Sequence, residues 1–259
     1  MIEVHPNLVA PPDTAVLWRY IDLSKYYSIL DTQTIYFAKA SKMDDKYEGI
    51  FPRKNRVVPE SQVRALVPDL TMSSEDLQDT HSRVIKRLED QGRETCHLSC
   101  WHMNPHQSAA MWKLYLKSDE GVGICTTFSD MKRAFCNSKD VIYPASVTYI
   151  DHQNDTIPVG NVFYPICHKR KSFEHEAEMR LVWWSGSITN REIVGLLDPN
   201  VPYPDDGRAV PVVLADLIQK VYVSPTSKAF FHEVVKSITK KHGLNCPVIK
   251  SDLDDGPVW

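Results

Sequence analysis

The most distinctive pattern of hydrophobic and polar positions lies in residues 171–184, which read K-S-F-E-H-E-A-E-M-R-L-V-W-W. The second half, 179–184, is rich in β-forming residues and predicts a buried strand. Glu174, Glu176 and Glu178 occupy every second position leading into it. Side chains two apart on a strand lie roughly 6.5–7 Å apart on one face, so Glu176 and Glu178 are expected to point the same way.

Carboxylates crowded on one face repel each other, which is expected to raise the pKa of one of them unless a cation, a ligand or water compensates. Arg180 is next on the same face. Replacing Glu178 by glutamine would then leave the fold no less stable. Residues 171–184 are therefore the candidate functional site. An alternative stays open: if residues 172–180 are helical, Glu176 and Arg180 form an ordinary surface pair.

Other strands are predicted from short apolar runs rich in β-branched and aromatic residues. They lie at 16–20, 34–38, 95–101, 121–128, 141–150, 220–223 and 246–251. Pro144 places part of the run 141–150 at a sheet edge. Apolar residues at helical spacing predict helices at 107–117, 130–135, 162–168 and 227–242. Polar segments are predicted to be irregular at 39–49, 51–72 and 198–208.

Two further helices carry signals for their ends. Asp22 is a suitable N-cap for the first helix. Its buried face is predicted from the i, i+4, i+7 spacing of Leu23, Tyr27 and Leu30. Ser73 is a suitable N-cap for a second helix, which Gly92 is predicted to close.

The order of these elements predicts the fold class. Helices do not alternate with strands regularly enough for a doubly wound sheet, so we expect an α+β fold with a mixed, largely antiparallel sheet flanked by helices. A chain of 259 residues can bury a large core as one domain. Residues 1–15 are predicted to form an extended N-terminal arm and residues 16–259 a single domain.

Composition narrows the class of protein. The chain is 42% hydrophobic and 24% charged, with a net charge of −3, which argues against a broad nucleic-acid surface that ignores sequence. The longest apolar runs are far shorter than a membrane span, and no secretory signal begins the sequence. The six cysteines lie mostly in apolar stretches, as expected for reduced thiols in the cytoplasm.

Several polar residues inside predicted strands are candidate ligand contacts. Arg19 offers a bidentate fork for a phosphate or carboxylate, whereas an ordinary edge-strand arginine would reach solvent. Alternation in the strand at 95–101 places Ser99 and Trp101 on one face and Cys100 and His102 on the other. Ser99 and Trp101 are therefore expected on a ligand wall, with a locally bonded hydroxyl as the alternative for Ser99.

The absence of other motifs argues against several classes of protein. The chain has no glycine-rich phosphate cradle and no G-x-S-x-G elbow, so it is not typical of a P-loop ATPase, a Rossmann dehydrogenase or a hydrolase with that nucleophile. No zinc site is expected, because no loop of finger-like length separates the candidate ligands Cys96, Cys100, His102 and His106. A metal-dependent nuclease stays open, although the position two beyond Glu178 is an arginine where a lysine is expected.

The order of several motifs resembles a family of mostly bacterial proteins known as domain of unknown function 2971. The motifs are W-R-Y, K-M-D-D-K-Y-E-G, H-L-S-C-W-H, A-A-M-W-K-L-Y, G-V-G-I and K-S-F-E-H-E-A-E-M-R-L. The resemblance covers roughly residues 16–251. It implies no chemistry, because the family name carries none.

A second resemblance does imply chemistry. An arginine on an early strand, a serine on a middle strand and E-x-E on a late strand resemble ADP-ribosyltransferases of the arginine–serine–glutamate type. This resemblance implies that Arg19, with Tyr20, binds NAD and that Ser99 and Trp101 form the nicotinamide side of the site. Two features depart from the type: L-S-C-W replaces the usual S-T-S, and an arginine follows the glutamates.

The same resemblance implies that Glu178 is catalytic and that Glu176 orients or deprotonates the acceptor. The implied activity is cleavage of the nicotinamide–ribose bond of NAD and transfer of ADP-ribose to a protein or nucleic acid, as in a toxin or defence effector. Two alternatives stay open: a non-catalytic ligand-binding or interaction module, and a metal-dependent nuclease.

Overall fold

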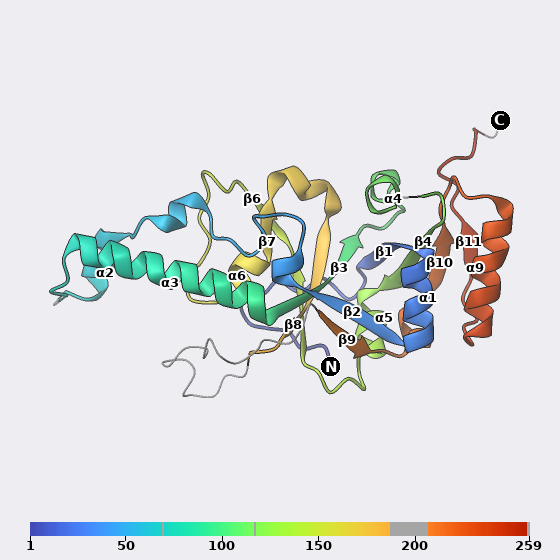
Figure 1. Ribbon diagram of the computed structural model, residues 1–259, viewed down its shortest axis with the longest axis horizontal. Coiled ribbons are helices and arrows are strands. Elements are labelled where there is room, and N and C mark those ends of the chain that lie inside the picture. Colours follow the sequence, from blue (N-terminus) through green and yellow to red (C-terminus); the bar gives the residue numbers. More distant parts are fainter. Residues whose placement is uncertain (69, 117, 187–206, 258–259) are drawn as a thin grey trace.

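The computed structural model describes residues 1–68, 70–116, 118–186 and 207–257. Most of its strands join one sheet (Figure 1). These strands are β1 (Val16–Asp22), β2 (Thr34–Lys39), β3 (Cys96–Met103), β4 (Gly121–Thr127), β5 (Ile142–Ser146), β8 (Glu178–Trp184), β9 (Gly207–Pro211), β10 (Lys220–Val223) and β11 (Val248–Lys250). The order is β11-β10-β4-β1-β3-β2-β9, and β8 and β5 join it through β3. All pairs are antiparallel except β10–β11, which confirms the mixed, largely antiparallel sheet.

The sheet divides at β3. On one edge, β8 pairs with β3 along its length, from Cys96 opposite Trp184 to His102 opposite Glu178. On the other edge, β2 pairs only near the start of β3 and β1 only near its end. Since a strand has two hydrogen-bonding edges, residues 99–101 of β3 face a fork between β1 and β2.

Helices cover both faces of this sheet. They are α1 (Leu23–Thr32), α2 (Glu60–Leu66), α3 (Ser74–Thr95), α4 (Ala109–Tyr115), α5 (Phe128–Ala134), α6 (Phe163–Ile166), α8 (Leu214–Leu217) and α9 (Ala229–Lys241). Three short 3₁₀ helices are η1 (Ala40–Lys42), η2 (Arg53–Arg56) and η3 (Lys171–Glu176), and β6 (Thr148–Ile150) pairs with β7 (His168–Arg170) in a small second sheet. The long α3 extends away from the main sheet toward α2, and α1 and α9 lie at the opposite end (Figure 1). The α+β class is confirmed.

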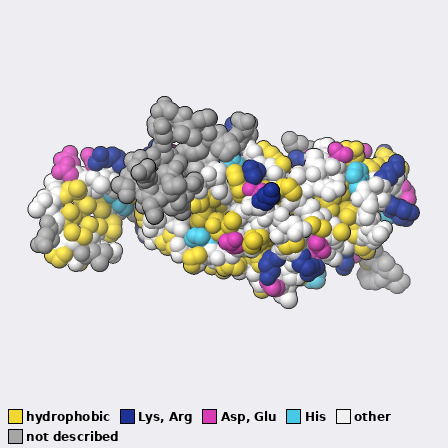
Figure 2. All heavy atoms as spheres, turned by 90° about the horizontal axis from the view of Figure 1, so that it is seen from below, with side chains coloured by type: hydrophobic (Ala, Val, Ile, Leu, Met, Phe, Trp, Pro, Cys, Tyr) yellow, Lys and Arg dark blue, Asp and Glu magenta, His cyan; other side chains and the backbone are white. Residues whose placement is uncertain are grey.

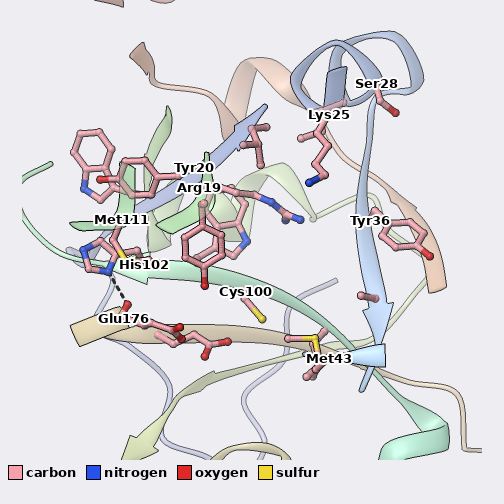
Figure 3. Close-up of a pocket in the computed structure, with 18 of the residues that line it drawn as sticks. Arg19, Tyr20, Lys25, Ser28, Tyr36, Met43, Cys100, His102, Met111 and Glu176 are labelled. Carbon is pink, nitrogen blue, oxygen red and sulfur yellow. Dashed lines mark hydrogen bonds between the residues drawn. The ribbon is translucent and has the colours of Figure 1, made fainter. Parts of the chain in front are cut away.

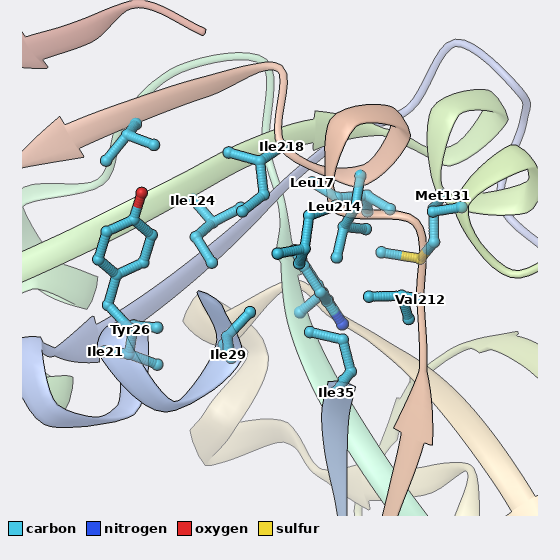
Figure 4. Close-up of a cluster of buried hydrophobic side chains, with 14 of the residues drawn as sticks. Leu17, Ile21, Tyr26, Ile29, Ile35, Ile124, Met131, Val212, Leu214 and Ile218 are labelled. Carbon is cyan, nitrogen blue, oxygen red and sulfur yellow. The ribbon is translucent and has the colours of Figure 1, made fainter. Parts of the chain in front are cut away.

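The main hydrophobic core lies between one face of the sheet and α1, α5, α8 and α9. Figure 4 shows side chains from β1, α1, β4 and α8 meeting there, among them Ile21, Ile29, Ile124 and Leu214. A smaller apolar cluster on the opposite face packs β1 against α4. The face in Figure 2 carries basic and acidic side chains side by side, without one broad basic area.

Some helix predictions hold and others are wrong. Asp22 caps α1, accepting a hydrogen bond of 2.8 Å from the backbone N–H of Lys25. The predicted stripe is wrong at Tyr27, which is 46% exposed, because the buried face of α1 is formed by Tyr26, Ile29 and Leu30. The hydroxyl of Tyr26 lies 2.8 Å from that of Thr239 in α9, so this buried face of α1 contacts α9.

The segment after β2 also differs from the sequence prediction. Residues 51–72 are not wholly irregular, because they form η2 and α2. Gly92 does not end α3, which continues to Thr95. Gly92 serves close packing instead: a Cβ added there would lie 2.9 Å from the carbonyl oxygen of Val162.

Three other segments differ from the sequence prediction or extend it. The predicted strand at 141–150 is interrupted at Val147, giving β5 and β6. The first residues run beside β5, where the backbone N–H of Glu3 donates to the carbonyl of Ile142 at 2.9 Å. Most of the predicted loop at 198–208 lies outside the described residues, and positions 207 and 208 belong to β9. The division into an arm, 1–15, and a domain, 16–259, stays a prediction.

Candidate functional site

A cavity of about 620 Å³ lies at the fork between β1, β2 and β3 (Figure 3). Its walls come from these strands, α1, α4, η3 and the start of β8. Because β1 and β2 separate there, side chains from both faces of the sheet reach the same space. Volumes of 300–1,000 Å³ are typical of small-molecule sites.

The strand registers sort the candidate residues by face. His102 pairs with Trp18 of β1 and with Glu178 of β8, so these side chains share a face. Tyr20, Cys100 and Arg180 follow on it by alternation and register. The opposite face carries Arg19, Ser99 and Trp101. The predicted alternation in β3 is therefore confirmed, and Arg19 and Glu178 reach the cavity from different faces.

Arg19 is the most unusual cation of the cavity wall. Its Nη1 donates to the hydroxyl of Ser99, and its guanidinium carbon lies 5.5 Å from the centre of the Trp101 ring. Burial lowers the pKa of Arg19, while the cavity leaves part of the residue open. In the described parts of the chain, no carboxylate forms an ion pair with it. Arg19 thus places an uncompensated positive charge at the cavity.

Ser99, Trp101 and Tyr20 support this wall. The buried hydroxyl of Ser99 also accepts a hydrogen bond of 3.1 Å from Nε1 of Trp101, so Ser99 holds Arg19 from behind rather than lining the cavity. Trp101 and Tyr20 do line it. The hydroxyl of Tyr20 accepts a 3.0 Å hydrogen bond from the backbone N–H of Ser108, just before α4, and burial raises its pKa to about 12.

The structure corrects the geometry expected of the two glutamates. Glu176 is not on the strand: it ends η3, Ala177 adopts the left-handed conformation with φ 39°, and β8 begins at Glu178. The helical alternative is also wrong, because Glu176 pairs with Lys169 and not with Arg180. The turn still brings both carboxylates together: Nζ of Lys169 lies 2.5 Å from Glu176 Oε2 and 3.2 Å from Glu178 Oε2.

Arg180 and Glu48 complete a buried ion-pair cluster. Nε and Nη2 of Arg180 donate to the two oxygens of Glu178 at 2.8 and 3.0 Å. Nη1 and Nη2 donate to the two oxygens of Glu48 at 2.8 and 2.9 Å. Arg180 has no exposed surface, and Glu48 is 3% exposed. The cluster holds three carboxylates and two cations, which leaves one net negative charge beside the cavity.

The expected repulsion between the glutamates is therefore compensated. Burial alone would raise the pKa of Glu178, but the charges of Arg180 and Lys169 outweigh burial and lower the pKa to about 2. Burial would lower the pKa of Lys169, and the carboxylates of Glu178 and Glu48 raise it instead. The prediction that one carboxyl has a raised pKa is wrong for Glu178, and the expectation that Glu178→Gln leaves the fold no less stable loses its basis.

Sequence reasoning missed Glu48, Lys169 and His102 as parts of this site. Glu48 lies in the segment 39–49, which local pattern presents as a solvated turn. Nδ1 of His102 donates to the carbonyl of Glu176 at 2.6 Å, and His102 lines the cavity. The one available signal for Glu48 was its place in the K-Y-E-G motif, which recurs in the resemblance to domain of unknown function 2971.

The described residues offer no support for a metal site. No group of three or more His, Cys, Asp or Glu side chains among them is arranged to hold an ion, so the nuclease alternative lacks a donor set there. All six cysteines carry free thiols. Within the same residues, no helix is long and apolar enough to cross a membrane.

Comparisons with known proteins leave the family open. No protein-family model matches the chain, and no curated protein matches it. The resemblance to domain of unknown function 2971 therefore stays a prediction.

Similar solved structures include three complexes of DarT from Thermus sp. 2.9. The complex with NAD+ has a TM-score of 0.39 and 9% identity, covering 94% of this chain and 98% of that one. The complex with carba-NAD+ has a TM-score of 0.37 and 8% identity, with coverages of 93% and 96%. The complex with ADP-ribosylated single-stranded DNA has a TM-score of 0.39 and 8% identity, with coverages of 94% and 96%. A likeness of this degree assigns neither a family nor an activity.

Proposed function

We propose that this chain is an NAD-consuming ADP-ribosyltransferase with an ADP-ribosyltransferase-like fold, and that the cavity at the fork is its active site. One observation supports the proposal above all: a cation without a carboxylate partner among the described residues, Arg19, lines the same cavity as the carboxylates Glu176 and Glu178. The positive charge of Arg19 suits an anionic part of a ligand. The net negative charge of the carboxylate cluster suits a part of the ligand that becomes cationic during the reaction.

The pyrophosphate of NAD is the anionic part. Only one of the guanidinium's N–H groups is used by Ser99, so Arg19 keeps donors for two phosphate oxygens. Lys25 also lines the cavity, and Figure 3 shows it reaching into the same part of the cavity as Arg19. Trp101 and Tyr20 supply aromatic surface beside Arg19, which suits a planar nicotinamide ring.

The nicotinamide ribose is the part that becomes cationic. Breaking its bond to nicotinamide builds an oxocarbenium-like charge, as in glycoside hydrolysis. With a pKa of about 2, Glu178 stays ionised throughout the physiological range, so the cluster of three carboxylates and two cations keeps its net negative charge beside the cavity. A preorganised negative charge stabilises the transition state more than the ground state, and losing one such group typically costs about 100–1000-fold in rate.

The acceptor of ADP-ribose is proposed to be a protein or nucleic acid, in the cytoplasm, with a role as a toxin or defence effector. A non-catalytic NAD-binding module is the second candidate, because the uncompensated charge of Arg19 favours binding whether or not turnover follows. The two candidates differ only in whether the bond to nicotinamide is broken.

Incubation of the purified protein with NAD, with and without divalent metal, tests the proposal. We expect saturable NAD binding and release of nicotinamide, both independent of metal. Binding without release supports the module. If NAD neither binds nor reacts, and nucleic acid is cleaved only with metal, the transferase proposal fails in favour of a nuclease.

A further inference from the structure

The two cavity carboxylates differ in how their oxygens are engaged. Glu178 receives two hydrogen bonds from Arg180 and one from Lys169, which engage both of its oxygens. Three of the about four lone-pair sites of this carboxylate are therefore occupied. Glu176 receives one hydrogen bond, at Oε2 from Lys169, and no described residue donates to its Oε1.

The exposed fractions of the two side chains differ in the same sense. The side chain of Glu176 is 10% exposed, against 5% for Glu178, and both line the cavity. Glu48 is engaged like Glu178, with both oxygens on Arg180, but it does not line the cavity. Glu178 and Glu48 therefore form a pair that holds Arg180, and Glu176 lies outside that pair.

Backbone geometry directs Glu176 to the cavity. The left-handed conformation of Ala177 turns the chain between η3 and β8, so Glu176 does not follow the alternation of the strand. The hydrogen bond of 2.6 Å from His102 to the carbonyl of Glu176 ties this turn to β3. Figure 3 shows the carbonyl contact and the Glu176 side chain on the same side of the cavity as Cys100.

We infer that Glu176, through Oε1, is the carboxylate that contacts the substrate, and that Glu178 is a positioning residue that acts on it through Lys169. This inference rests on the proposed function and reverses the roles that the resemblance implies for the two glutamates. A substrate hydroxyl or amine would compete with buried, charge-assisted hydrogen bonds at both oxygens of Glu178, whereas Oε1 of Glu176 has no donor among the described residues.

The bond between ribose C1′ and the nicotinamide nitrogen breaks, and its electron pair leaves on that nitrogen as neutral nicotinamide. Oε1 of Glu176 stabilises the positive charge left on the ribose. A lone pair of the acceptor oxygen or nitrogen forms the new bond to C1′, and the acceptor proton passes to Oε1 and then to solvent.

Three matched variants test the assignment: Glu176→Gln, Glu178→Gln and Glu48→Gln. The probe is NAD with water as the acceptor, and nicotinamide release is measured at a temperature where each variant is folded. For Glu176→Gln we expect release to fall about 100–1000-fold, NAD affinity to change less than about threefold, and the melting temperature to change by less than about 3 °C, because an amide oxygen still accepts from Lys169.

The other two variants break the buried pairs of Arg180, so each should melt about 10 °C lower. Glu178→Gln should lower release about tenfold by displacing Glu176. In the Glu176→Gln background, Glu178→Gln should lower the melting temperature again without slowing release further. A purely structural Glu178 would show no such coupling.

Retained release in Glu176→Gln, combined with a loss of 100-fold or more in folded Glu178→Gln, would overturn the inference. Carboxylate labelling of the wild type with a carbodiimide and glycinamide gives a readout that does not depend on NAD. Glu176 should be modified while Glu178 and Glu48 are protected, and modification of Glu178 at an equal rate refutes the assignment. Absent NAD binding with Glu176 labelled would instead reject only the proposed function.

Discussion

Replacing each of the two arginines of this site, Arg19 and Arg180, by methionine should have opposite effects on stability and on NAD binding. Methionine keeps most of the apolar stem and removes the charge. Arg180 is bound by Glu178 and Glu48, whereas Arg19 donates to the neutral hydroxyl of Ser99. Arg180→Met leaves two buried carboxylates with only Lys169, and breaking a buried pair in this way typically costs about 3–5 kcal/mol.

Arg19→Met should behave differently. It removes a buried charge that no carboxylate among the described residues compensates, and Ser99 still accepts from Trp101. Unfolding free energy should therefore stay within about 1 kcal/mol of the wild type. NAD binding should weaken, because two charge-assisted hydrogen bonds to the pyrophosphate together contribute about 3–6 kcal/mol, so the dissociation constant should rise at least about 100-fold.

Urea unfolding followed by tryptophan fluorescence measures the first quantity, and calorimetric titration with NAD measures the second. The reasoning is refuted if Arg19→Met destabilises the protein as much as Arg180→Met, because Arg19 would then be a structural cation. It is also refuted if the folded Arg19→Met protein binds NAD as tightly as the wild type does.

Three further predictions concern the charge cluster, the rotation of α1 and the zinc content of the protein. Since the pKa of Glu178 is lowered from an ordinary 4.5 to about 2, its ion pairs should contribute roughly 3 kcal/mol above pH 4.5, lost as the pH falls through 2. Urea unfolding across this range should show that slope, and Glu178→Gln should flatten it. Tyr26→Phe should lower the free energy of unfolding by about 1 kcal/mol, because it removes the hydrogen bond to Thr239. Tyr27→Phe at the exposed neighbour should lower it by almost nothing. Equal losses of stability in thermal unfolding would contradict the rotation of α1. Purified protein should contain less than stoichiometric zinc by elemental analysis, and zinc that Cys100→Ser removes would show a metal site.

Much of the sheet could be predicted from the sequence, because its signals are local. The runs at 16–20, 34–38, 121–128 and 220–223 each carry β-forming residues between clear breaks, and all four are strands. The cap at Asp22 is likewise a local interaction over three residues. The rotation of α1 was not predictable in this way, because Tyr26 is buried against α9, where its partner Thr239 lies 213 residues away.

The candidate site was predictable only in part, for the same reason. Glu176 and Glu178 stand out in the sequence, but the turn between them is made by an alanine at φ 39°, and alanine gives no signal for a left-handed conformation. Glu48 and Lys169 look like solvated charges in polar segments. Glu48 is buried against Arg180, which lies 132 residues away, and Lys169 is buried against Glu176 and Glu178.

The fork in the sheet explains why these distant residues meet. If β1 alone paired with the whole of β3 on this edge, Arg19 and Glu178 would lie on opposite faces of a closed sheet, separated by its backbone. Because β1 and β2 pair only with opposite ends of β3, the middle of β3 is open to both faces. The cavity forms there, between a cation held by Ser99 on one face and carboxylates held by Lys169 and Arg180 on the other. The same missing strand pairing that divides the sheet thus places opposite charges around one ligand-sized space.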